Sequence, residues 1–331
     1  MKIQFIERNP DNKVGSYRIW VKDLSKTLIE LGHTVGVSNT VNNLEPNTNV
    51  VIFSKSSYKD IDRLKLNFKG IKVGAINVAC DHKSEKIDFI IAGSHEERTS
   101  LSFYNNVFVY PLIERKFMDL PQKNHINEGK IRLCFHGHYP HLFKFFPHLQ
   151  LAIQELSKYI KTELVIITGP SNFKWVKKLG MPDGIKIEYH LYDDNTFTDI
   201  VQSCDIGLVP NASDILPIAP NLKTITSVDC GLYDTDFFIR YKNKTNSGRA
   251  YVFYQHGIPV IHDLSPSNFE FMGKTGRYSC AHDAASWFRE LKKFLNPDIR
   301  QLESDINRRI FEEHFSPFKH AENLIEFINK I

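Results

Sequence analysis

Short apolar runs and helical segments alternate along almost the whole chain. In the first half, runs rich in β-branched and aromatic residues predict strands at 2–7, 34–38, 50–54, 72–77, 88–92 and 107–110. Leucines and isoleucines recur at helical spacing over 15–31, where Gly32 is the stop signal, and further helical segments are expected at 58–67 and 95–104. Strands that alternate with helices predict an α/β fold with a parallel sheet covered on both faces.

The same alternation starts again after residue 130. Strands are predicted at 131–137, 163–168, 185–191, 206–210 and 259–262, and helices at 148–160, 196–203, 283–295, 298–313 and 318–331. The stretch PQKNHINEGK at 121–130 is polar, and a chain of 331 residues is long enough for two hydrophobic cores. We therefore predict Rossmann-like domains at 1–120 and 131–315, a linker at 121–130, and a C-terminal helix at 316–331 that can pack back on the first domain. Residues 212–241 are read as a long loop.

Composition narrows the choice of partners. A net charge of +4 without a long Lys/Arg run suits an anionic small ligand or an anionic membrane surface and argues against nucleic acid. Five cysteines without a C-x-x-C pair favour reduced thiols in a cytoplasmic protein. The N-terminus lacks a signal-peptide core and no apolar run approaches ~20 residues. Any membrane contact is therefore expected to be peripheral, at the inner face.

The segment KTNSGRAYVFYQHGIPVI at 244–261 carries the strongest functional pattern. It predicts a basic loop, a short helix that ends at Gly257, and a strand. Asn246 and Ser247 are good N-cap residues, and a helix that starts there directs its free N–H groups and its positive dipole end at a ligand. Lys244 and Arg249 add positive charge at the same end, a combination that suits a diphosphate. An ordinary strand–helix–strand unit with a solvated basic loop would give the same pattern.

This helix and four other segments together resemble the nucleotide-sugar glycosyltransferases with the GT-B fold, of the broad family-4-like type. The other segments are LGHTV at 31–35, DFIIAGSHEER at 88–98, VFVYPLIE at 107–114 and CDIGLVP at 204–210. The resemblance implies two Rossmann-like domains that face each other across a cleft. It also implies that the nucleotide sugar binds to the second domain and the acceptor to the first, and that no metal is required.

Two features depart from the pattern of this family. Its members usually carry two glutamates separated by seven residues, one before the donor helix and one within it. Counting back from Gly257, these positions hold Lys244 and Val252. The basic pair usual in the first loop of the second domain is also altered, because that loop reads GHYPHLFK at 137–144. These changes leave the donor sugar and the stereochemistry of transfer open.

The resemblance implies a donor site at the two loops just described. The predicted diphosphate-binding residues are Gly137, His138, Lys144, Asn246, Ser247, Gly248 and Arg249. Arg249 and Lys244 would take the main catalytic task, which is to stabilise the negative charge on the departing diphosphate. A solvated surface lysine is the alternative for Lys144.

The acceptor is expected at the carboxyl edge of the first sheet. The loop Cys80-Asp81-His82-Lys83 follows a predicted strand, at the edge where open α/β folds bind ligands. Asp81 or His82 could serve as the base for the acceptor hydroxyl, unless the enzyme is retaining and needs none. The other residues predicted on the acceptor side are Gly15, Ser16 and Ser94.

Other chemistries find little support. His138 and His141 are separated by Pro140 and have no carboxylate nearby in the sequence, so we predict no metal site and no cofactor beyond the nucleotide sugar as substrate. G-x-S-x-G, P-loop and G-x-G-x-x-G motifs are missing, which argues against hydrolase, P-loop and dinucleotide chemistry.

The sequence therefore predicts a glycosyltransferase, of the hexosyltransferase type, that acts on a glycan, a lipid-linked or a small-molecule acceptor. One alternative is a non-catalytic GT-B scaffold that binds a nucleotide sugar or partners an active transferase. Another is a nucleotide-sugar epimerase. The aromatic and basic residues at 142–146 and 103–110 read as core packing or as a membrane-facing patch for a lipid-linked acceptor.

Overall fold

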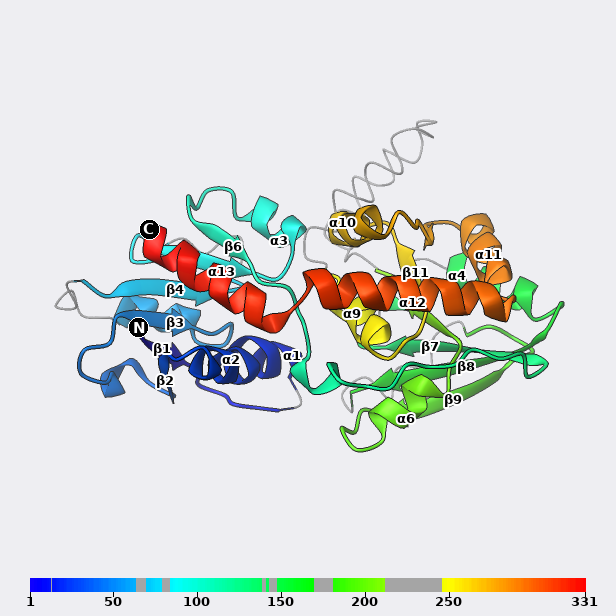
Figure 1. Cartoon of the computed structure of the whole chain (residues 1–331), viewed down its shortest axis with the longest axis horizontal. Coiled ribbons are helices and arrows are strands. Elements are labelled where there is room, and N and C mark those ends of the chain that lie inside the picture. Colours follow the sequence, from blue (N-terminus) through cyan, green and yellow to red (C-terminus); the bar gives the residue numbers. More distant parts are fainter. Residues whose placement is uncertain are drawn as a thin grey trace. The chain divides into compact units, whose positions relative to one another are not determined.

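The computed structural model describes residues 1–12, 14–63, 70–78, 84–138, 141–142, 148–169, 181–211 and 246–331. Within these ranges, two sheets of six parallel strands each are formed, in the orders β2-β1-β3-β4-β5-β6 and β12-β11-β10-β7-β8-β9 (Figure 1). The predicted α/β class with parallel sheets is confirmed. Parallel strands need crossover connections, and the helices between them supply these.

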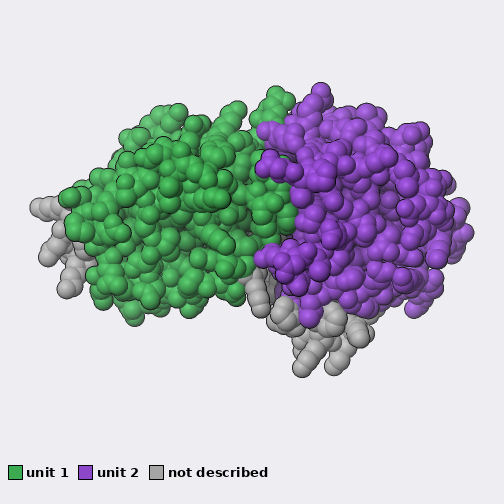
Figure 2. All heavy atoms as spheres, turned by 60° about the horizontal axis from the view of Figure 1, so that its bottom comes forward, with its two compact units in different colours: residues 1–118, 313–331 green, residues 119–312 purple. Residues whose placement is uncertain are grey.

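The chain divides into two compact units, which Figure 2 shows in different colours. Unit 1 comprises residues 1–118 and 313–331, and unit 2 comprises residues 119–312. Each unit contains one of the two sheets and has its own hydrophobic core.

The strands of unit 1 are short and mostly buried. β3 and β5 are buried at every residue, as expected for central strands with helices on both faces. The strands are β1 Lys2–Ile6, β2 Thr34–Ser38, β3 Val50–Phe53, β4 Lys72–Ile76, β5 Phe89–Ala92 and β6 Val107–Val109. All six lie within one residue of their predicted bounds.

The helix predicted at 15–31 forms, but its path is not uniform. It consists of α1 Gly15–Tyr17, a π-helical segment η1 Arg18–Asp23, and α2 Leu24–Glu30. The extra residue of a π-turn changes which side chains face the core, and here Ile19, Trp20 and Val21 are all buried. The remaining helices of the described part of unit 1 are η2 Val41–Asn43, η3 Tyr58–Arg63, α3 His95–Ser100, η4 Arg115–Phe117 and α13 Pro317–Lys330, and α13 packs on α2.

Unit 2 repeats the same layering around its own sheet. Its strands are β7 Lys130–His136, β8 Lys161–Thr168, β9 Lys186–Leu191, β10 Ile206–Val209, β11 Val260–Asp263 and β12 Cys280–Ala281. Its described helices are α4 His148–Leu156, α6 Phe197–Gln202, α9 Gly248–Gln255, α10 Pro266–Thr275, α11 Ala284–Lys293 and α12 Pro297–His314. α4 and α11 pack side by side on the sheet.

Neither α10 nor β12 was predicted from the sequence. The boundaries of α10 nevertheless carry standard signals, because Ser265 occupies the N-cap, Pro266 the first turn, and Gly276 the C-cap with φ of +65°. β12 has only two residues, too few for a periodic pattern.

The segment predicted as a linker contacts α12 and α6 of unit 2. The Gln122 amide donates to the Ser304 hydroxyl at 3.0 Å, and Lys123 Nζ donates to the carbonyl of Gln202 at 2.6 Å. Further along, the Arg300 guanidinium donates to the carbonyl of Ile126 at 2.7 Å. This stretch therefore satisfies its polar groups without forming a helix or strand of its own.

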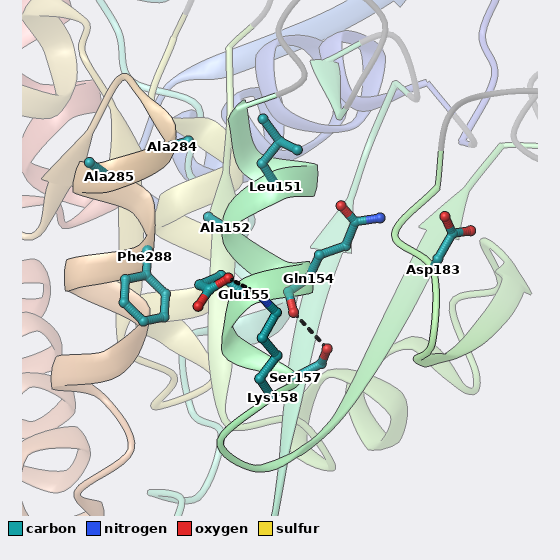
Figure 3. A pocket seen from close by; sticks show the side chains of 10 residues that line it. All are labelled: Leu151, Ala152, Gln154, Glu155, Ser157, Lys158, Asp183, Ala284, Ala285 and Phe288. Atoms are coloured by element: carbon teal, nitrogen blue, oxygen red, sulfur yellow. Dashed lines mark hydrogen bonds and ion pairs between the residues drawn. The ribbon is translucent and has the colours of Figure 1, made fainter.

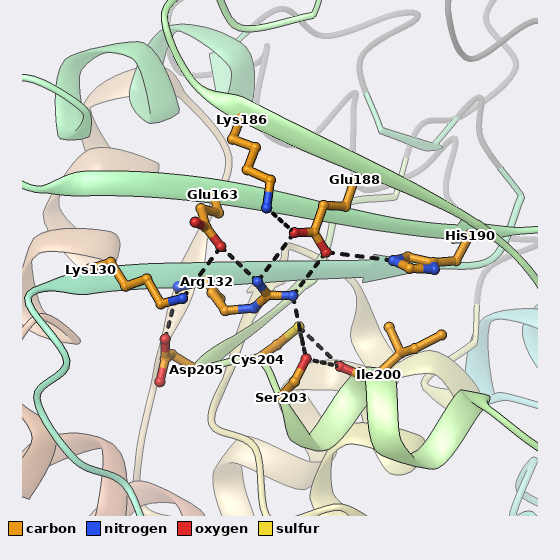
Figure 4. A network of polar contacts seen from close by, with 10 residues as sticks. All are labelled: Lys130, Arg132, Glu163, Lys186, Glu188, His190, Ile200, Ser203, Cys204 and Asp205. Atoms are coloured by element: carbon orange, nitrogen blue, oxygen red, sulfur yellow. Dashed lines mark hydrogen bonds and ion pairs between the residues drawn. The ribbon is translucent and has the colours of Figure 1, made fainter.

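Charged side chains connect the amino-terminal halves of three neighbouring strands (Figure 4). Arg132 on β7 pairs with Glu163 on β8 at 2.6 Å and with Glu188 on β9 at 3.0 Å, and Lys186 pairs with Glu188 at 2.6 Å. Hydrogen bonds from Lys186 and Arg132 lower the pKa of Glu188 to about 2. The network stabilises the β7-β8-β9 order at the edge opposite the strands' carboxyl ends.

No described helix combines the length and apolar character needed to span a bilayer.

Candidate functional site

Two neighbouring strands of the unit 2 sheet connect outward in opposite directions. β7 is followed by β8 and β9 on one side, whereas β10 is followed by β11 and β12 on the other. Gly207 pairs with Cys134, so three residues further along, Pro210 and Gly137 lie at adjacent carboxyl ends. In open α/β sheets, the point where the strand order reverses is where ligands bind. The loops that follow β7 and β10 therefore define the candidate site.

Gly137 follows β7 and has a backbone conformation that favours glycine, with φ of +119°. Its N–H donates to the carbonyl of Ile167 at 3.0 Å, and its own carbonyl accepts from the Thr168 hydroxyl at 2.9 Å. A Cβ atom here would lie 2.9 Å from Cδ of Arg249. The missing side chain at position 137 thus allows Arg249 to lie over the end of β7.

Arg249 is the second residue of α9, and its guanidinium lies among buried groups. Its Nη2 donates to Oδ1 of Asn211, and its Cζ lies 5.7 Å from the centre of the Phe135 ring. Its Nη1 is buried and has no hydrogen-bond partner among the described residues. Burial lowers the pKa of Arg249 to about 10 while the carboxylate of Asp263 opposes this shift, so the side chain is still charged at neutral pH. A buried cation with an unused donor is unfavourable unless an anion binds to it.

Asn211 supplies a second donor at the same place. It is 1% exposed and follows the end of β10. Its Oδ1 accepts from Arg249, and its Nδ2 is buried without a hydrogen-bond partner in the described part of the chain. Its backbone N–H donates to Oδ2 of Asp263 at 3.0 Å, which fixes its position. Arg249 Nη1 and Asn211 Nδ2 are thus two buried donors at one end of the sheet.

A chain of hydrogen bonds ties the elements around these donors together. The Ser247 hydroxyl donates to Oδ1 of Asn268 on α10 at 2.9 Å. Nδ2 of Asn268 donates to the carbonyl of Asp263 at 3.0 Å, and Oδ1 of Asp263 accepts from the N–H of Leu264 at 2.7 Å. α9, α10 and the end of β11 are therefore held in a fixed arrangement.

The first turn of α9 lies next to the two donors. Ser247 occupies the N-cap position, but its side chain does not cap the helix because it bonds Asn268 instead. Asn246 Oδ1 accepts from the N–H of Gly248 at 3.1 Å. Every residue from 250 to 255 is buried, so the direction of the helix is set by packing. Its positive dipole end adds to the charge of Arg249.

His136, the last residue of β7, contacts the backbone of α9. Its Nε2 lies 3.0 Å from the carbonyl oxygen of Arg249, and its ring packs edge-on against Phe197 and Phe253. Burial lowers its pKa to about 3, so the ring is neutral and donates Nε2–H to the carbonyl. The backbone of Arg249 is thereby held at the carboxyl end of β7.

Several residues predicted for the donor side lie together in this region. Gly137 and Arg249 are in contact, and Asn246, Ser247 and Gly248 form the start of α9. His138 is exposed next to Gly137, and its ring centre lies 6.0 Å from that of His141. Lys144 and Lys244 lie outside the described residues.

The residues predicted for the acceptor side belong to unit 1. Gly15 and Ser16 begin α1. Ser94 is buried at the N-cap of α3, where its hydroxyl accepts from the N–H of Glu97 at 3.1 Å. Asp81 and His82 lie outside the described residues.

The sequence reading missed Asn211, Asp263 and Asn268. A signal for the first two was present, because each is a polar residue at the carboxyl end of a buried, correctly predicted strand: Asn211 follows β10 by two residues, and Asp263 is the last residue of β11. Position alone did not reveal that Asn211 would bond Arg249, which is 38 residues away in the sequence.

A groove of about 690 Å³ lies elsewhere on unit 2, between α4 and α11 (Figure 3). Its walls include Leu151 and Phe288, and none of the candidate-site residues around Arg249 and Asn211 lines it. Among the described residues, no group of three or more His, Cys, Asp or Glu side chains is placed to hold a metal ion.

Solved structures share the fold of this chain. A glycosyltransferase from Rickettsia africae matches with a TM-score of 0.62 at 13% identity, over 98% of this chain and 97% of that one. Sucrose-phosphate synthase from Thermosynechococcus elongatus matches with a TM-score of 0.60 at 10% identity, over 99% and 98%. HepE from Anabaena, solved with UDP and glucose, matches with a TM-score of 0.58 at 12% identity over the full length of both chains.

No protein-family model matches the chain, and no curated protein does. The likeness to these glycosyltransferase structures confirms the predicted GT-B fold.

Proposed function

We propose that this chain is a glycosyltransferase that moves a sugar from a nucleoside-diphosphate donor to a hydroxyl acceptor. The observation that carries the proposal is a pair of buried donors, Arg249 Nη1 and Asn211 Nδ2, which have no hydrogen-bond partner among the described residues and lie at the point where the strand order of unit 2 reverses. Both groups donate hydrogen bonds and one is charged, so the group that would satisfy them is an anion. A diphosphate offers several acceptor oxygens to such a pair.

The reaction needs negative charge to be stabilised as it develops. The bond between the anomeric carbon and the diphosphate oxygen breaks, and its electron pair leaves with the diphosphate. The acceptor oxygen bonds the same carbon and loses its proton. Arg249, Asn211 and the first N–H groups of α9 would stabilise the departing diphosphate, and positioned donors of this kind act without reorganising. We assign no metal to this step.

The finer assignments also belong to this proposal. We infer a hexose as the transferred sugar and a glycan, a lipid-linked or a small-molecule hydroxyl as the acceptor, bound on the unit 1 side with Asp81 or His82 as the base. Lys144 and Lys244 are proposed as further diphosphate ligands. The reaction is placed in the cytoplasm, where peripheral contact with the inner face of the membrane would give access to a lipid-linked acceptor.

The direct test is a thermal-shift series with UDP, GDP, CDP, ADP and TDP, with EDTA and with Mg²⁺. A ligand that binds only the native state raises the Tm by mass action. We expect one nucleotide to raise the Tm in both buffers. In Arg249→Ala this shift should disappear, and transfer with the matching nucleotide sugar should fall by on the order of 10²–10³-fold.

The matched control is Arg289→Ala, because Arg289 is 70% exposed and lies on α11. This variant should keep the full nucleotide shift. An Arg249→Ala protein that folds and transfers sugar as fast as the parent would overturn the assignment.

One observation favours a second candidate, a non-catalytic scaffold that binds a nucleotide sugar. Val252, at the position where the resemblance expects a glutamate, is 5% exposed within α9. A buried valine offers no polar contact to a sugar ring. The scaffold would show the same nucleotide shift but no turnover with any acceptor, so a product assay separates the two candidates.

A further inference from the structure

A second cavity, of about 490 Å³, lies in unit 1 between the segments that enter β5 and β6. These segments lie at the amino ends of the two strands, whereas Ser94, on the predicted acceptor side, follows the carboxyl end of β5. The lining combines aromatic, amide and carboxylate side chains, and includes Glu85, Asp88, Phe103, Tyr104, Asn105 and Asn106.

An aromatic ring forms one wall of this cavity. Phe103 is 38% exposed, and its ring centre lies 4.8 Å from that of Tyr104, with the planes tilted by 40°. Tyr104 is fixed in turn, because its hydroxyl accepts from the N–H of Ser84 at 3.1 Å. The Phe103 ring is therefore exposed to solvent and supported from the protein side.

Two polar side chains of the cavity, those of Asp88 and Asn106, are held in place by hydrogen bonds to the backbone. Oδ2 of Asp88 accepts from the N–H of Val73 on β4 at 2.7 Å. Nδ2 of Asn106 donates to the carbonyl of Asp88 at 2.9 Å. Glu85 and Asn105 are exposed at the same opening. The cavity thus offers one fixed carboxylate and one fixed amide, together with the exposed side chains of Glu85 and Asn105, beside the exposed Phe103 ring.

We propose that this cavity is a secondary binding site for a neutral saccharide chain. A pyranose ring has an apolar face of C–H groups, which can pack on an aromatic ring, and a rim of hydroxyls, which donate to planar oxygen acceptors. The cavity provides both features a few residues apart. An anionic ligand does not suit it, because Glu85 and Asp88 are both acidic, and no described metal-ligand cluster exists there or elsewhere.

This site would add a second point of contact for the acceptor, and this role rests on the proposed glycosyltransferase function. It would hold a remote part of a glycan acceptor, away from the reacting hydroxyl. Binding there would raise the affinity for long acceptors and leave short acceptors unaffected, because only a long chain reaches both sites.

The test is calorimetric titration of the full chain with maltohexaose, cellohexaose and chitohexaose. We expect at least one of them to bind, and Phe103→Ala to weaken that binding at least tenfold. Phe103→Trp, which keeps an aromatic face, should retain it. The control is Phe269→Ala, since Phe269 on α10 is also 38% exposed, and this variant should bind like the parent.

The outcomes also separate this site from the donor site. A nucleotide shift without binding of any hexasaccharide, or binding that survives Phe103→Ala, overturns the saccharide site and leaves the proposed transferase intact. Hexasaccharide binding that depends on Phe103 supports the saccharide site even if no nucleotide binds. In that case only the proposed transferase function is rejected. Thermal melting of each variant checks that folding is retained.

Discussion

Both sheets contain a point where the strand order reverses, but the side chains at the two points carry opposite charge. In unit 1 this point lies between β1 and β3, and Glu7 follows β1. Glu7 is 5% exposed, and its carboxylate accepts from the N–H of Asn9 at 2.8 Å and from the Ser56 hydroxyl. In unit 2 the equivalent point carries the guanidinium of Arg249.

The two points also differ in how fully their polar groups are satisfied. The Glu7 carboxylate accepts hydrogen bonds from its own unit, whereas Arg249 Nη1 and Asn211 Nδ2 remain without partners among the described residues. The same topology therefore provides the same location twice, and the residues there decide which ligand can bind. The point in unit 2 is thus suited to an anion, whereas the point in unit 1 presents the Glu7 carboxylate.

Among variants that keep Arg249, the largest effect is expected when a neighbouring residue neutralises its charge. In Asn211→Asp, the new carboxylate would pair with Arg249 and repel a diphosphate. We expect nucleotide affinity, measured by calorimetry, to fall by on the order of 100-fold while the fold is retained. Asn195→Asp, at an exposed position before α6, is the control. Undiminished binding in Asn211→Asp would place the diphosphate elsewhere.

A smaller effect is expected when the space for Arg249 is reduced. Gly137→Ala places a Cβ 2.9 Å from Cδ of Arg249 and forces an alanine into a left-handed conformation. We expect about 1–2 kcal/mol of lost stability and a roughly tenfold loss of nucleotide affinity. Gly273→Ala is the matched control, because a Cβ there meets no atom within 4 Å. Equal nucleotide affinities in these two variants would show that the contact between position 137 and Arg249 does not affect binding.

In unit 1, removing the charge of Glu7 should affect stability without affecting the nucleotide. Glu7→Gln keeps the size and an acceptor oxygen, but it removes the charge that strengthens the two hydrogen bonds to Oε1, so we expect a loss of about 1–2 kcal/mol in the free energy of unfolding. The nucleotide-induced rise in Tm should stay unchanged. Glu45→Gln, whose side chain is 53% exposed, should change neither quantity. A lost nucleotide shift in Glu7→Gln would end the contrast between the units.

The last effect concerns pH, to which the two units should respond in opposite directions. In unit 2, burial lowers the pKa of His125 and His262 from 6.5 to about 4. The unfolded chain takes up these protons first, so unit 2 should lose roughly 1–2 kcal/mol per ring as the pH falls from 6.5 towards 5. In unit 1, burial raises the pKa of Glu97 from 4.5 to about 7. Its contribution to stability is fully present below pH 4.5 and is lost as the pH rises through 7.

Hydrogen exchange followed by mass spectrometry at pH 7.5 and pH 5.0 resolves the two units. Protection of β8 should decrease at pH 5.0 relative to protection of β3. A parallel change in both strands would mean that these buried groups do not control the difference.

The strand–helix alternation was readable in the sequence because it depends on local periodicity. Residues such as Ile3, Phe5 and Val51 alternate or cluster within a few positions, and each predicted strand of unit 1 formed within one residue of its expected bounds. α10 was not predicted because the signals for it lie at its ends and not in the periodicity of its apolar residues. α9 was predicted because an unbroken run of apolar and aromatic residues at 250–254 lies between its polar start and its glycine stop.

By itself, the sequence determined the α/β class, the two sheets and the cationic helix start at Asn246–Arg249, because propensity, capping and charge are properties of neighbouring residues. Only the tertiary structure decided that Asn211, Gly137 and Arg249 meet, that Asp263 fixes Asn211, and that Ser247 bonds α10 instead of capping its own helix. These residues lie in different segments of the chain. Their contacts follow from the strand order, in which β10 lies beside β7, and strand order is a long-range property that no local pattern encodes.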